Sequence, residues 1–289
     1  MKIGILGFGI VGEVTSKVFG TKHEIFPYDL YREKYNSLEN LKKLARESEV
    51  VFVCVPTPMK PSGEMDYSIL YDSLNSLKKI IEEIGRNPQE LIVTIRSTTV
   101  SGTTDKLAKE FPFKIAFNPE FLTERTALED MKNTNRIILG VEDELSKQKL
   151  IELYKVLFPN AKYIIVNRKT AEMIKYAANV TLASQVAIAN EIYQICKTLN
   201  IDYNIVKDTI ILDPLIGKNN NVPGPDGDFG FGGKCLPKDL NALIYLAREH
   251  GYRPHFLEGI WSLNERVRKN KNWLEIPGAT SKNQNFKNQ

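Results

Sequence analysis

Cysteine is scarce in this sequence of 289 residues, and its scarcity excludes two kinds of small-protein scaffold. The chain has three cysteines, Cys54, Cys196 and Cys235, and no two of them lie close together in the sequence. An odd, dispersed set matches neither a disulfide framework nor a zinc site. We therefore expect reduced thiols, a cytoplasmic location and no metal site.

Long hydrophobic runs and blocks of one charge are also missing. No apolar run approaches the ~20 residues that a membrane helix needs. The apolar stretch after Met1 is broken by glycines and lacks a small-residue cleavage site, so a first strand explains it better than a signal peptide. The formal net charge is only +4, with both signs interspersed. Such a charge could attract an anionic substrate, but we expect neither a nucleic-acid partner nor a membrane.

Short apolar segments alternate with amphipathic helical segments over the first 167 residues. Segment 2–6 fits a buried parallel strand, while segment 37–48 places leucines on one helix face. This alternation predicts an α/β fold with an N-terminal Rossmann domain, whose sheet is parallel and doubly wound. The expected strands are residues 2–6, 23–29, 50–57, 90–98, 113–120, 136–142 and 162–166.

The pattern changes after Asn167, where a smaller all-helical domain is expected. Residues 170–199 contain neither glycine nor proline and predict one long helix, with further helices over 202–212 and 239–250. The apolar surface of the long helix needs a cover, which favours a homodimer. The expected domains are residues 1–167, residues 168–268, and a polar, disordered tail over 269–289.

A glycine-rich turn follows the first expected strand and opens a helix. Gly7 permits a tight turn, Gly9 lets the backbone approach a pyrophosphate, and Gly12 permits close packing of helix on strand. Asp29, at the end of the next strand, would bond a ribose 2′-hydroxyl and repel a 2′-phosphate, which favours NAD over NADP. A glycine-rich turn in another α/β protein is the alternative. The candidate cofactor contacts of the turn are Gly7, Phe8, Gly9, Ile10, Val11 and Gly12.

Lys175 and Asn179 share a face of the expected long helix, because residues four apart are neighbours on a helix surface. Ala178 and Ala183 make that surface small and apolar, so a cation and an amide donor could together hold a developing oxyanion. Taken alone, the pair is better explained as a solvated lysine beside a surface asparagine, because most helix lysines are exposed.

Cys235 follows a glycine-rich loop and precedes a helix expected to begin near Asp239. A helix N-terminus and neighbouring lysines favour the thiolate, which is the nucleophilic form. An unreactive buried thiol is the weaker alternative. Cys54, inside a strand, and Cys196, on an apolar helix face, are expected to be inert core residues.

Two glutamates stand near the C-terminal end of an expected strand, where open α/β sheets bind ligands. Glu120 or Glu124 could act as a general base toward water. Considered alone, they are better explained as helix-start glutamates that compensate a helix dipole.

Together these segments resemble the UDP-glucose/GDP-mannose dehydrogenase family, from Lys2 to about Arg268. The glycine-rich turn and Asp29 look like the family's NAD fingerprint, with Lys34 where the family often has arginine. The segments that match the family's motifs, in the same order, are Val55–Pro58 with Pro56 and Thr57, Ser97–Thr98, Asn118–Glu124, Lys175 with Asn179, and Gly230–Asp239.

The resemblance implies oxidation of the C6 alcohol of a nucleotide sugar to a carboxylate, with NAD as cofactor. UDP-glucose to UDP-glucuronate is the first expectation, and glucose, mannose and N-acetylated hexosamine nucleotides are all handled by related motifs. The C6 alcohol would lose a hydride to NAD while Asp239, with a water near Thr98, assists removal of the hydroxyl proton. Cys235 would then capture the aldehyde. Lys175 and Asn179 would stabilise the oxyanion of this thiohemiacetal. A second oxidation would leave a thioester, which Glu120 would help water to hydrolyse. The implied further cofactor contacts are Asp29, Lys34, Pro56, Thr57, Ser97, Thr98 and Glu124, and the implied sugar-nucleotide contacts are Glu120, Phe121, Leu122, Glu124, Lys175, Asn179, Phe229, Gly230 and Gly232.

The sequence departs from the family pattern in two places. Leu215 stands where the family has an arginine that reaches a neighbouring subunit's sugar, and Lys218 is a candidate replacement. The family usually carries a second Rossmann-like, nucleotide-binding domain after the helical one. This sequence has a polar tail there, and we expect a short form without that domain.

Two other functions fit part of the pattern. A β-hydroxyacid dehydrogenase also joins a Rossmann domain to a helical domain with a lysine and an asparagine on the long helix, but it needs no nucleophilic cysteine. An inactive NAD-binding subunit that only dimerises would have no reason to keep Cys235, Lys175, Asn179, Glu120 and Asp239 together.

Overall fold

The computed structural model describes residues 1–214, 216 and 221–281, which belong to two compact units. The first unit comprises residues 1–57 and 66–175, and the second comprises residues 58–65 and those from Tyr176 onward. The division lies inside a helix, after the boundary expected at Asn167. Residues 58–65 join the second unit although they lie far from it in sequence, which no feature of the sequence indicated.

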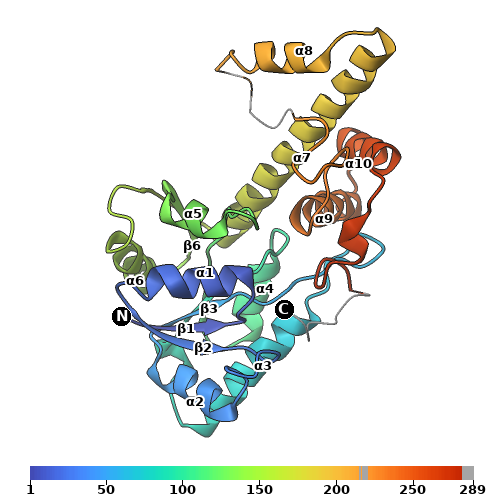
Figure 1. Cartoon of the computed structure of the whole chain (residues 1–289). Coiled ribbons are helices and arrows are strands. Elements are labelled where there is room, and N and C mark those ends of the chain that lie inside the picture. The colour runs from blue at the N-terminus through green and yellow to red at the C-terminus, as the bar shows by residue number, and fades with distance from the viewer. Residues whose placement is uncertain (215, 217–220, 282–289) are drawn as a thin grey trace. The chain divides into compact units, whose positions relative to one another are not determined.

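A seven-stranded sheet forms the centre of the first unit (Figure 1). Its order is β2-β1-β3-β4-β5-β6-β7, and every neighbouring pair is parallel except β5 with β6. The expected Rossmann architecture is confirmed, and its sheet is parallel apart from this one pair. Antiparallel neighbours need no crossover connection, so the chain between β5 and β6 stays at the end of the sheet where β5 finishes. The strands are β1 (Lys2–Leu6), β2 (Glu24–Tyr28), β3 (Val50–Val53), β4 (Ile92–Ile95), β5 (Lys114–Phe117), β6 (Arg136–Gly140) and β7 (Lys162–Val166).

Helices cover both faces of this sheet because alternate strand residues point to opposite sides. Val51 and Val53 of β3 pack in a core with α2, α3 and α4, while Val50 and Phe52 pack in a second core with α1, α5 and α6 (Figure 1). The helices are α1 (Ile10–Phe19), α2 (Leu38–Glu47), α3 (Ser68–Glu83), α4 (Thr103–Glu110), α5 (Ala127–Lys132) and α6 (Glu144–Lys155), with a 3-10 turn η1 (Pro88–Glu90).

The second unit is helical, as expected, and a long helix leads into it from the first. Ala183 and Ala187 of that helix pack against Leu240, Ile244 and Ile260. A smaller cluster buries Cys196, and Cys54 is buried in the first unit, so both lie where inert thiols were expected. The elements are α7 (Arg168–Thr198), α8 (Tyr203–Ile210), α9 (Cys235–Glu249), α10 (His255–Val267) and the 3-10 turn η2 (Asn272–Leu274).

The expected disorder of the tail is wrong over residues 269–281. Trp273 is buried and its ring lies 5.5 Å from that of Trp261. The backbone N–H of Met59 donates to the Ala279 carbonyl, and that of Ser281 donates to the Met59 carbonyl, each at 2.9 Å. The partner for this polar stretch comes from a distant segment, so composition could not reveal it. The rest of the expected tail, residues 282–289, lies outside the described residues.

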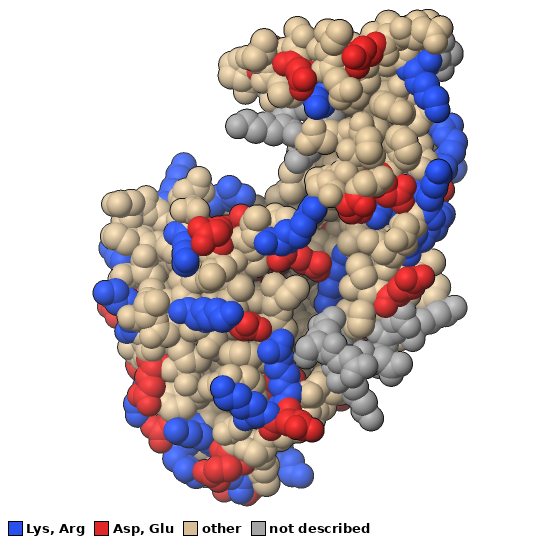
Figure 2. Space-filling view, in the orientation of Figure 1, with Lys and Arg blue, Asp and Glu red and all other residues tan. Residues whose placement is uncertain are grey.

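Charged side chains of both signs are interspersed over the visible face of the first unit (Figure 2). Among the helices that the structure describes, none has the length and apolar character needed to cross a bilayer.

Candidate functional site

The glycine-rich turn between β1 and α1 has a distinct steric reason for each of its three glycines. Gly7 has a φ of +93°, in the left-handed region that favours glycine. A Cβ at Gly12 would lie 2.0 Å from the Gly7 carbonyl oxygen, so only glycine lets α1 approach the strand. A Cβ at Gly9 would meet nothing within 4 Å. The turn therefore leaves open space at Gly9, where the sequence predicts a pyrophosphate.

Asp29 lies directly after β2 and is bonded to the same turn. Its Oδ2 accepts from the N–H of Phe8 at 2.6 Å, and its Oδ1 accepts from the N–H groups of Tyr31 and Arg32 at 2.8 and 3.1 Å. A carboxylate offers about four acceptor positions, so roughly one remains for a ribose hydroxyl. Asp29 thus positions the turn itself, a function that the sequence did not indicate.

Arg32 is a cation beside Phe8 of the turn, and the sequence did not single it out. Its guanidinium lies 5.8 Å from the Phe8 ring centroid and 3.3 Å from the carboxylate of Glu13. Lys34, expected to replace a family arginine, instead lies over the Tyr35 ring at 5.2 Å. The loop after β2 therefore contains two cations, Arg32 and Lys34, and of these Arg32 lies beside Phe8 of the glycine-rich turn.

The loops after β3 and β4 bind each other. Ser97 Oγ donates to the Val55 carbonyl at 2.6 Å, and Thr57 Oγ1 donates to the Thr98 carbonyl at 2.8 Å. Both donating hydroxyls are buried and hold backbone, whereas Thr98 and Pro56 are half-buried. Of this group, Thr98 is the residue whose side chain remains available to hold a water.

Glu172 is a buried carboxylate on α7 that sequence reasoning did not single out. It accepts hydrogen bonds from Thr99 Oγ1 at 2.9 Å, from the N–H groups of Gly102 and Thr104 at 2.6 and 2.8 Å, and from Thr104 Oγ1. Burial raises the pKa of Glu172, and the hydrogen bonds oppose that rise. The contacts tie the segment after Thr98 to the helix turn that precedes Lys175. In the sequence, the one sign of a role for Glu172 is its position three residues before Lys175 on the expected long helix.

Lys175 and Glu120 form a buried ion pair in the first unit. Lys175 is 3% exposed, and its Nζ donates to the carbonyl oxygen of Glu120 at 2.7 Å and to its Oε1 at 3.2 Å. Glu120 Oε2 accepts from the N–H of Leu122 at 2.6 Å. The alternatives of a solvated lysine and a helix-start glutamate are therefore wrong for this pair. Glu124 is exposed.

Phe121 lies between two cations beside this pair. The Lys175 ammonium is 5.3 Å from its ring centroid, and the Arg136 guanidinium is 4.6 Å away. Cations at such distances are attracted by the electron-rich ring face. Phe121 and Leu122 are half-buried, so this loop presents apolar surface next to a buried charge pair.

Three buried polar residues form a connected group in the second unit. Asn179 Nδ2 donates to Asp239 Oδ2, and the Lys238 ammonium pairs with Asp239 Oδ1 at 2.5 Å. The exposed fractions of Asn179, Lys238 and Asp239 are 7%, 4% and 1%. Asp239 is thus held by an amide and a cation, and Lys238 is a contact that sequence reasoning had not placed.

Helix α9 begins at Cys235, four residues before the start expected at Asp239. Pro237 lies in the first turn of this helix, which tolerates proline because its N–H groups have no partner within the helix. The thiol of Cys235 therefore lies on the first turn of α9 and is half-buried. This places it at a positive helix end, which favours a thiolate nucleophile.

The loop before Cys235 is held by side-chain amides. Asn190 Oδ1 accepts from the N–H of Gly230 at 2.9 Å. Asn264 accepts from the N–H of Phe231 at 2.8 Å and donates to the Phe231 carbonyl at 3.0 Å. Asn272 Oδ1 accepts from the N–H of Gly233 at 3.0 Å. These asparagines come from α7, α10 and η2, and sequence reasoning missed all three.

At two glycines expected to contact the sugar nucleotide, side chains of the protein fill the space that a Cβ would occupy. A Cβ at Gly230 would lie 2.2 Å from Asn264 Oδ1, and one at Gly232 would lie 2.1 Å from Arg268 Nη2. Arg268 is buried and pairs with Asp226 at 2.6 Å. These glycines are therefore explained by the close approach of protein side chains.

The candidate residues are divided between the two units. The first contains the glycine-rich turn, Thr98, Glu120 and Lys175, and the second contains Asn179, the loop over 229–233, Cys235 and Asp239. Phe229 is half-buried, with its ring 5.4 Å from that of Tyr193. Leu215 and Lys218, where the family arginine was sought, lie outside the described residues.

Two sequence models of protein families match the chain. The NAD binding domain of the UDP-glucose/GDP-mannose dehydrogenase family matches residues 29–158, and the central domain of the same family matches residues 169–266. The family resemblance predicted from the motifs is thereby confirmed, and an NAD-binding domain of this family is present.

Relatives with assigned activities are similar over most of the chain. A UDP-glucose 6-dehydrogenase of Rickettsia prowazekii is 33% identical over 226 residues, which are 76% of this chain and 50% of the relative. One of Bacillus subtilis is 29% identical over 305 residues, 92% of this chain and 63% of the relative. The chain spans about half the length of several of the curated relatives it matches.

Solved structures share the fold. A UDP-glucose dehydrogenase from Pyrobaculum islandicum superposes with a TM-score of 0.79 at 27% identity, covering 92% of this chain and 68% of the other. A GDP-mannose dehydrogenase from Pseudomonas aeruginosa gives a TM-score of 0.66 at 29% identity, covering 92% and 69%.

Proposed function

Because the chain belongs to the UDP-glucose/GDP-mannose dehydrogenase family, we propose that it is an NAD-dependent nucleotide-sugar dehydrogenase that oxidises a C6 alcohol to a carboxylate. UDP-glucose is the proposed substrate, which the names of several relatives support. The observation that carries the proposal is Cys235 on the first turn of α9, three and four residues before the buried Lys238–Asp239 pair. A thiol there can hold an aldehyde for a second oxidation, with a carboxylate base one turn further along the helix.

The first unit fits a dinucleotide at the glycine-rich turn. Gly9 leaves open space, α1 directs its N-terminus to that space, and Asp29 retains an acceptor position for a ribose hydroxyl. Bound NAD would supply the hydride acceptor for both oxidations. Further contacts are proposed from Phe8, Ile10, Val11, Lys34, Pro56, Thr57, Ser97, Thr98 and Glu124.

The first oxidation requires a base for the C6 hydroxyl proton. Asp239 is proposed to take that proton, assisted by a water that Thr98 holds, while a hydride leaves C6. Asn179 and Lys238 hold the Asp239 carboxylate in one position. A base held in this way needs little reorganisation during proton transfer.

The second oxidation requires that the aldehyde stay bound. The Cys235 sulfur is proposed to bond to C6, and Lys175 and Asn179 stabilise the resulting oxyanion. Loss of a second hydride leaves a thioester. Water then bonds to C6, the carbon–sulfur bond breaks, and Glu120 accepts a proton from the water.

Substrate contacts and assembly complete the proposal. The nucleotide sugar would contact Glu120, Phe121, Leu122, Glu124, Lys175, Asn179 and the loop Phe229–Gly232. A homodimer packed through α7 is proposed because Leu182 and Ile188 of that helix are 41% and 51% exposed. Light scattering at micromolar concentration tests it, and a monomer would contradict it.

The first experiment measures NADH formed per UDP-glucose consumed, with purified protein and excess NAD. We expect a ratio of two, because the alcohol loses two hydrides on the way to the carboxylate. Cys235→Ser should abolish carboxylate formation, whereas Cys196→Ala, at a cysteine buried in an apolar cluster, should retain it. A ratio of one, or unchanged carboxylate formation by Cys235→Ser, would contradict the proposal.

A further inference from the structure

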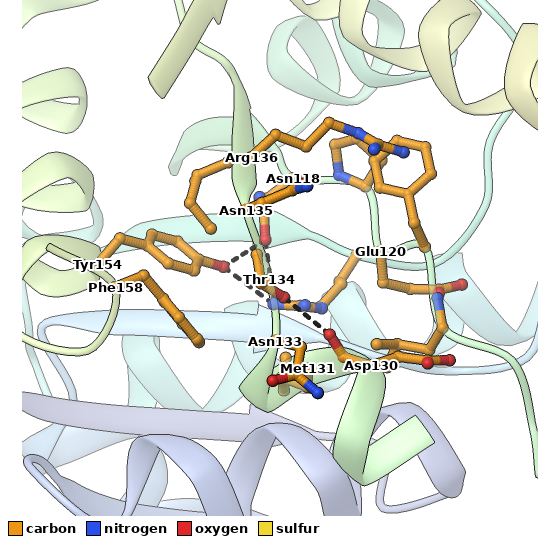
Figure 3. A pocket seen from close by; sticks show the side chains of 15 residues that line it. Asn118, Glu120, Asp130, Met131, Asn133, Thr134, Asn135, Arg136, Tyr154 and Phe158 are labelled. Carbon is orange, nitrogen blue, oxygen red and sulfur yellow. Dashed lines mark hydrogen bonds between the residues drawn. The ribbon is translucent and has the colours of Figure 1, made fainter. Parts of the chain in front are cut away.

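A cleft of about 250 Å³ opens beside Glu120 within the first unit (Figure 3). It is lined by the loop after β5, by residues from the end of α5 to the start of β6, and by side chains around the end of α6. Its lining residues Asn133, Asn135 and Arg136 are exposed, whereas Asn118 and Glu120 are buried. The cleft therefore extends from the surface to the carboxylate of Glu120.

Arg96 lines the buried part of this cleft and is 6% exposed. Its Nη1 donates to Asn118 Oδ1 at 3.0 Å and to the Tyr154 hydroxyl at 2.9 Å. Its Nε is buried and has no hydrogen-bond partner within the part of the chain that the structure describes. Buried donors in polar cavities are normally satisfied by ordered water.

The lining is suited to water more than to an apolar ligand. Asparagine, threonine, arginine, tyrosine and carboxylate groups line it together with six apolar residues, and only wholly apolar cavities are expected to stay dry. Since a water occupies roughly 30 Å³ in the liquid, the cleft has room for several. Asp130 Oδ2 is engaged by the N–H of Thr123 and the hydroxyl of Thr126, and Thr134 Oγ1 donates to the Asp130 carbonyl, whereas Arg96 Nε is left to bind water.

A bound nucleotide sugar and cofactor exclude bulk water from the reacting carbon. Hydrolysis of the proposed thioester nevertheless consumes one water. We propose that the cleft beside Glu120 supplies this water, with Arg96 and Asn118 holding a water in its buried part and Glu120 receiving the next. The inference rests on the proposed function.

In the proposed hydrolysis of the thioester, each bond that forms is matched by one that breaks. The water oxygen bonds to the thioester carbon, the carbon–sulfur bond breaks, and the sulfur departs from the carboxyl product. One water proton passes to Glu120 and from there to solvent or sulfur, so the carboxylate is ready for another turnover. Arg96 and Asn118 act as positioning residues, because they touch the water and not the sugar.

Asn135→Phe is the test variant, because Asn135 is exposed at the cleft and only its backbone carbonyl bonds elsewhere, to the N–H of Lys162. Lys132→Phe is the matched control, since Lys132 is exposed on α5 and does not line the cleft. Each protein is mixed rapidly with NAD and UDP-glucose, and NADH formation is followed by absorbance. The mass of the protein in acid-quenched samples is measured by intact mass spectrometry.

For Asn135→Phe we expect an unchanged initial burst of two NADH per active chain, followed by a steady rate at least ~10-fold slower than wild type. The mass of the Cys235 thioester should accumulate in this variant and not in Lys132→Phe. Equal steady rates and equal thioester levels in the two variants would overturn the inference while leaving the proposed function intact. Absence of NADH from the wild-type protein would overturn the proposed function and this inference with it.

A crystal structure provides a second measurement that does not depend on turnover. We expect an ordered water within hydrogen-bond distance of Arg96 Nε and further waters in line toward Glu120. A closed or dry cleft would overturn the inference.

Discussion

The two units hold their candidate site residues by different means. In the first, strand ends are bonded to the main chain of neighbouring strands, as when Ser97 donates to the Val55 carbonyl. In the second, the loop before Cys235 depends on the side-chain amides of Asn190, Asn264 and Asn272. A sheet edge positions residues through topology, whereas a loop in a helical unit needs specific side-chain partners from distant segments.

The largest effect is expected at the ion pair of Lys175 and Glu120. There the first unit uses a contact between side chains, whereas its strand ends are bonded to main-chain groups. Lys175→Met leaves the buried carboxylate unpaired, and breaking a buried pair typically lowers the free energy of unfolding by about 3–5 kcal/mol. Urea unfolding followed by far-UV circular dichroism measures the change. Lys175→Met with Glu120→Gln should recover much of the loss, and equal losses in the single and double variants would show that the pair is not coupled.

A smaller effect should appear in the second unit at Asn264. Asn264→Ala leaves the buried N–H and carbonyl of Phe231 without partners, and we expect a loss of about 2 kcal/mol. Fluorescence reports this unit selectively, because the only two tryptophans of the chain, Trp261 and Trp273, belong to it.

The matched control for this variant is Asn204→Ala, since Asn204 is exposed on α8. It should change the free energy of unfolding by roughly 0.5 kcal/mol or less. If the two variants have equal effects, the amides around the loop do not hold it, and the contrast between the units fails.

The smallest effect concerns pH and Glu172. Burial raises the pKa of this carboxyl above its ordinary value of 4.5, so between the two values the folded chain binds the proton more tightly than the unfolded chain does. The contribution of Glu172 to stability is therefore fully present below 4.5 and decreases as the pH rises through the folded pKa.

Glu172→Gln removes this titration and serves as the reference. We expect the stability advantage of wild type over the variant to fall between pH 4.5 and pH 7.5, measured by urea unfolding at several pH values. A constant difference across this range would show that the pKa of Glu172 is not raised.

Elements whose pattern is local could be predicted from the sequence. The strands and the long helix follow from apolar runs and from the absence of glycine and proline over 170–199. The steric reasons for Gly7 and Gly12 agree with the motif, because a strand, a tight turn and a helix are consecutive in the chain. The start of α9 lies four residues before the expected one, and Pro237 falls in its first turn, a position that tolerates proline.

Features that join distant segments could not be predicted in this way. Three features require knowledge of which segments meet: the antiparallel pairing of β6 with β5, the pairing of Met59 with residues 279–281, and the bonds of Glu172. Burial of Lys175 belongs to the same class, because a lysine on a helix is exposed unless another element covers it.

The sequence by itself determined the architecture, the family and the residue types available for chemistry, because periodicity and motif spacing are local properties of the chain. Tertiary structure alone decided that Lys175 meets Glu120, that Asn179 and Lys238 hold Asp239, and that three asparagines support the loop before Cys235. The physical reason is that a buried polar group is stable only with a specific partner. For Asp239 one such partner, Lys238, is the adjacent residue, whereas the other, Asn179, lies 60 residues away along the chain.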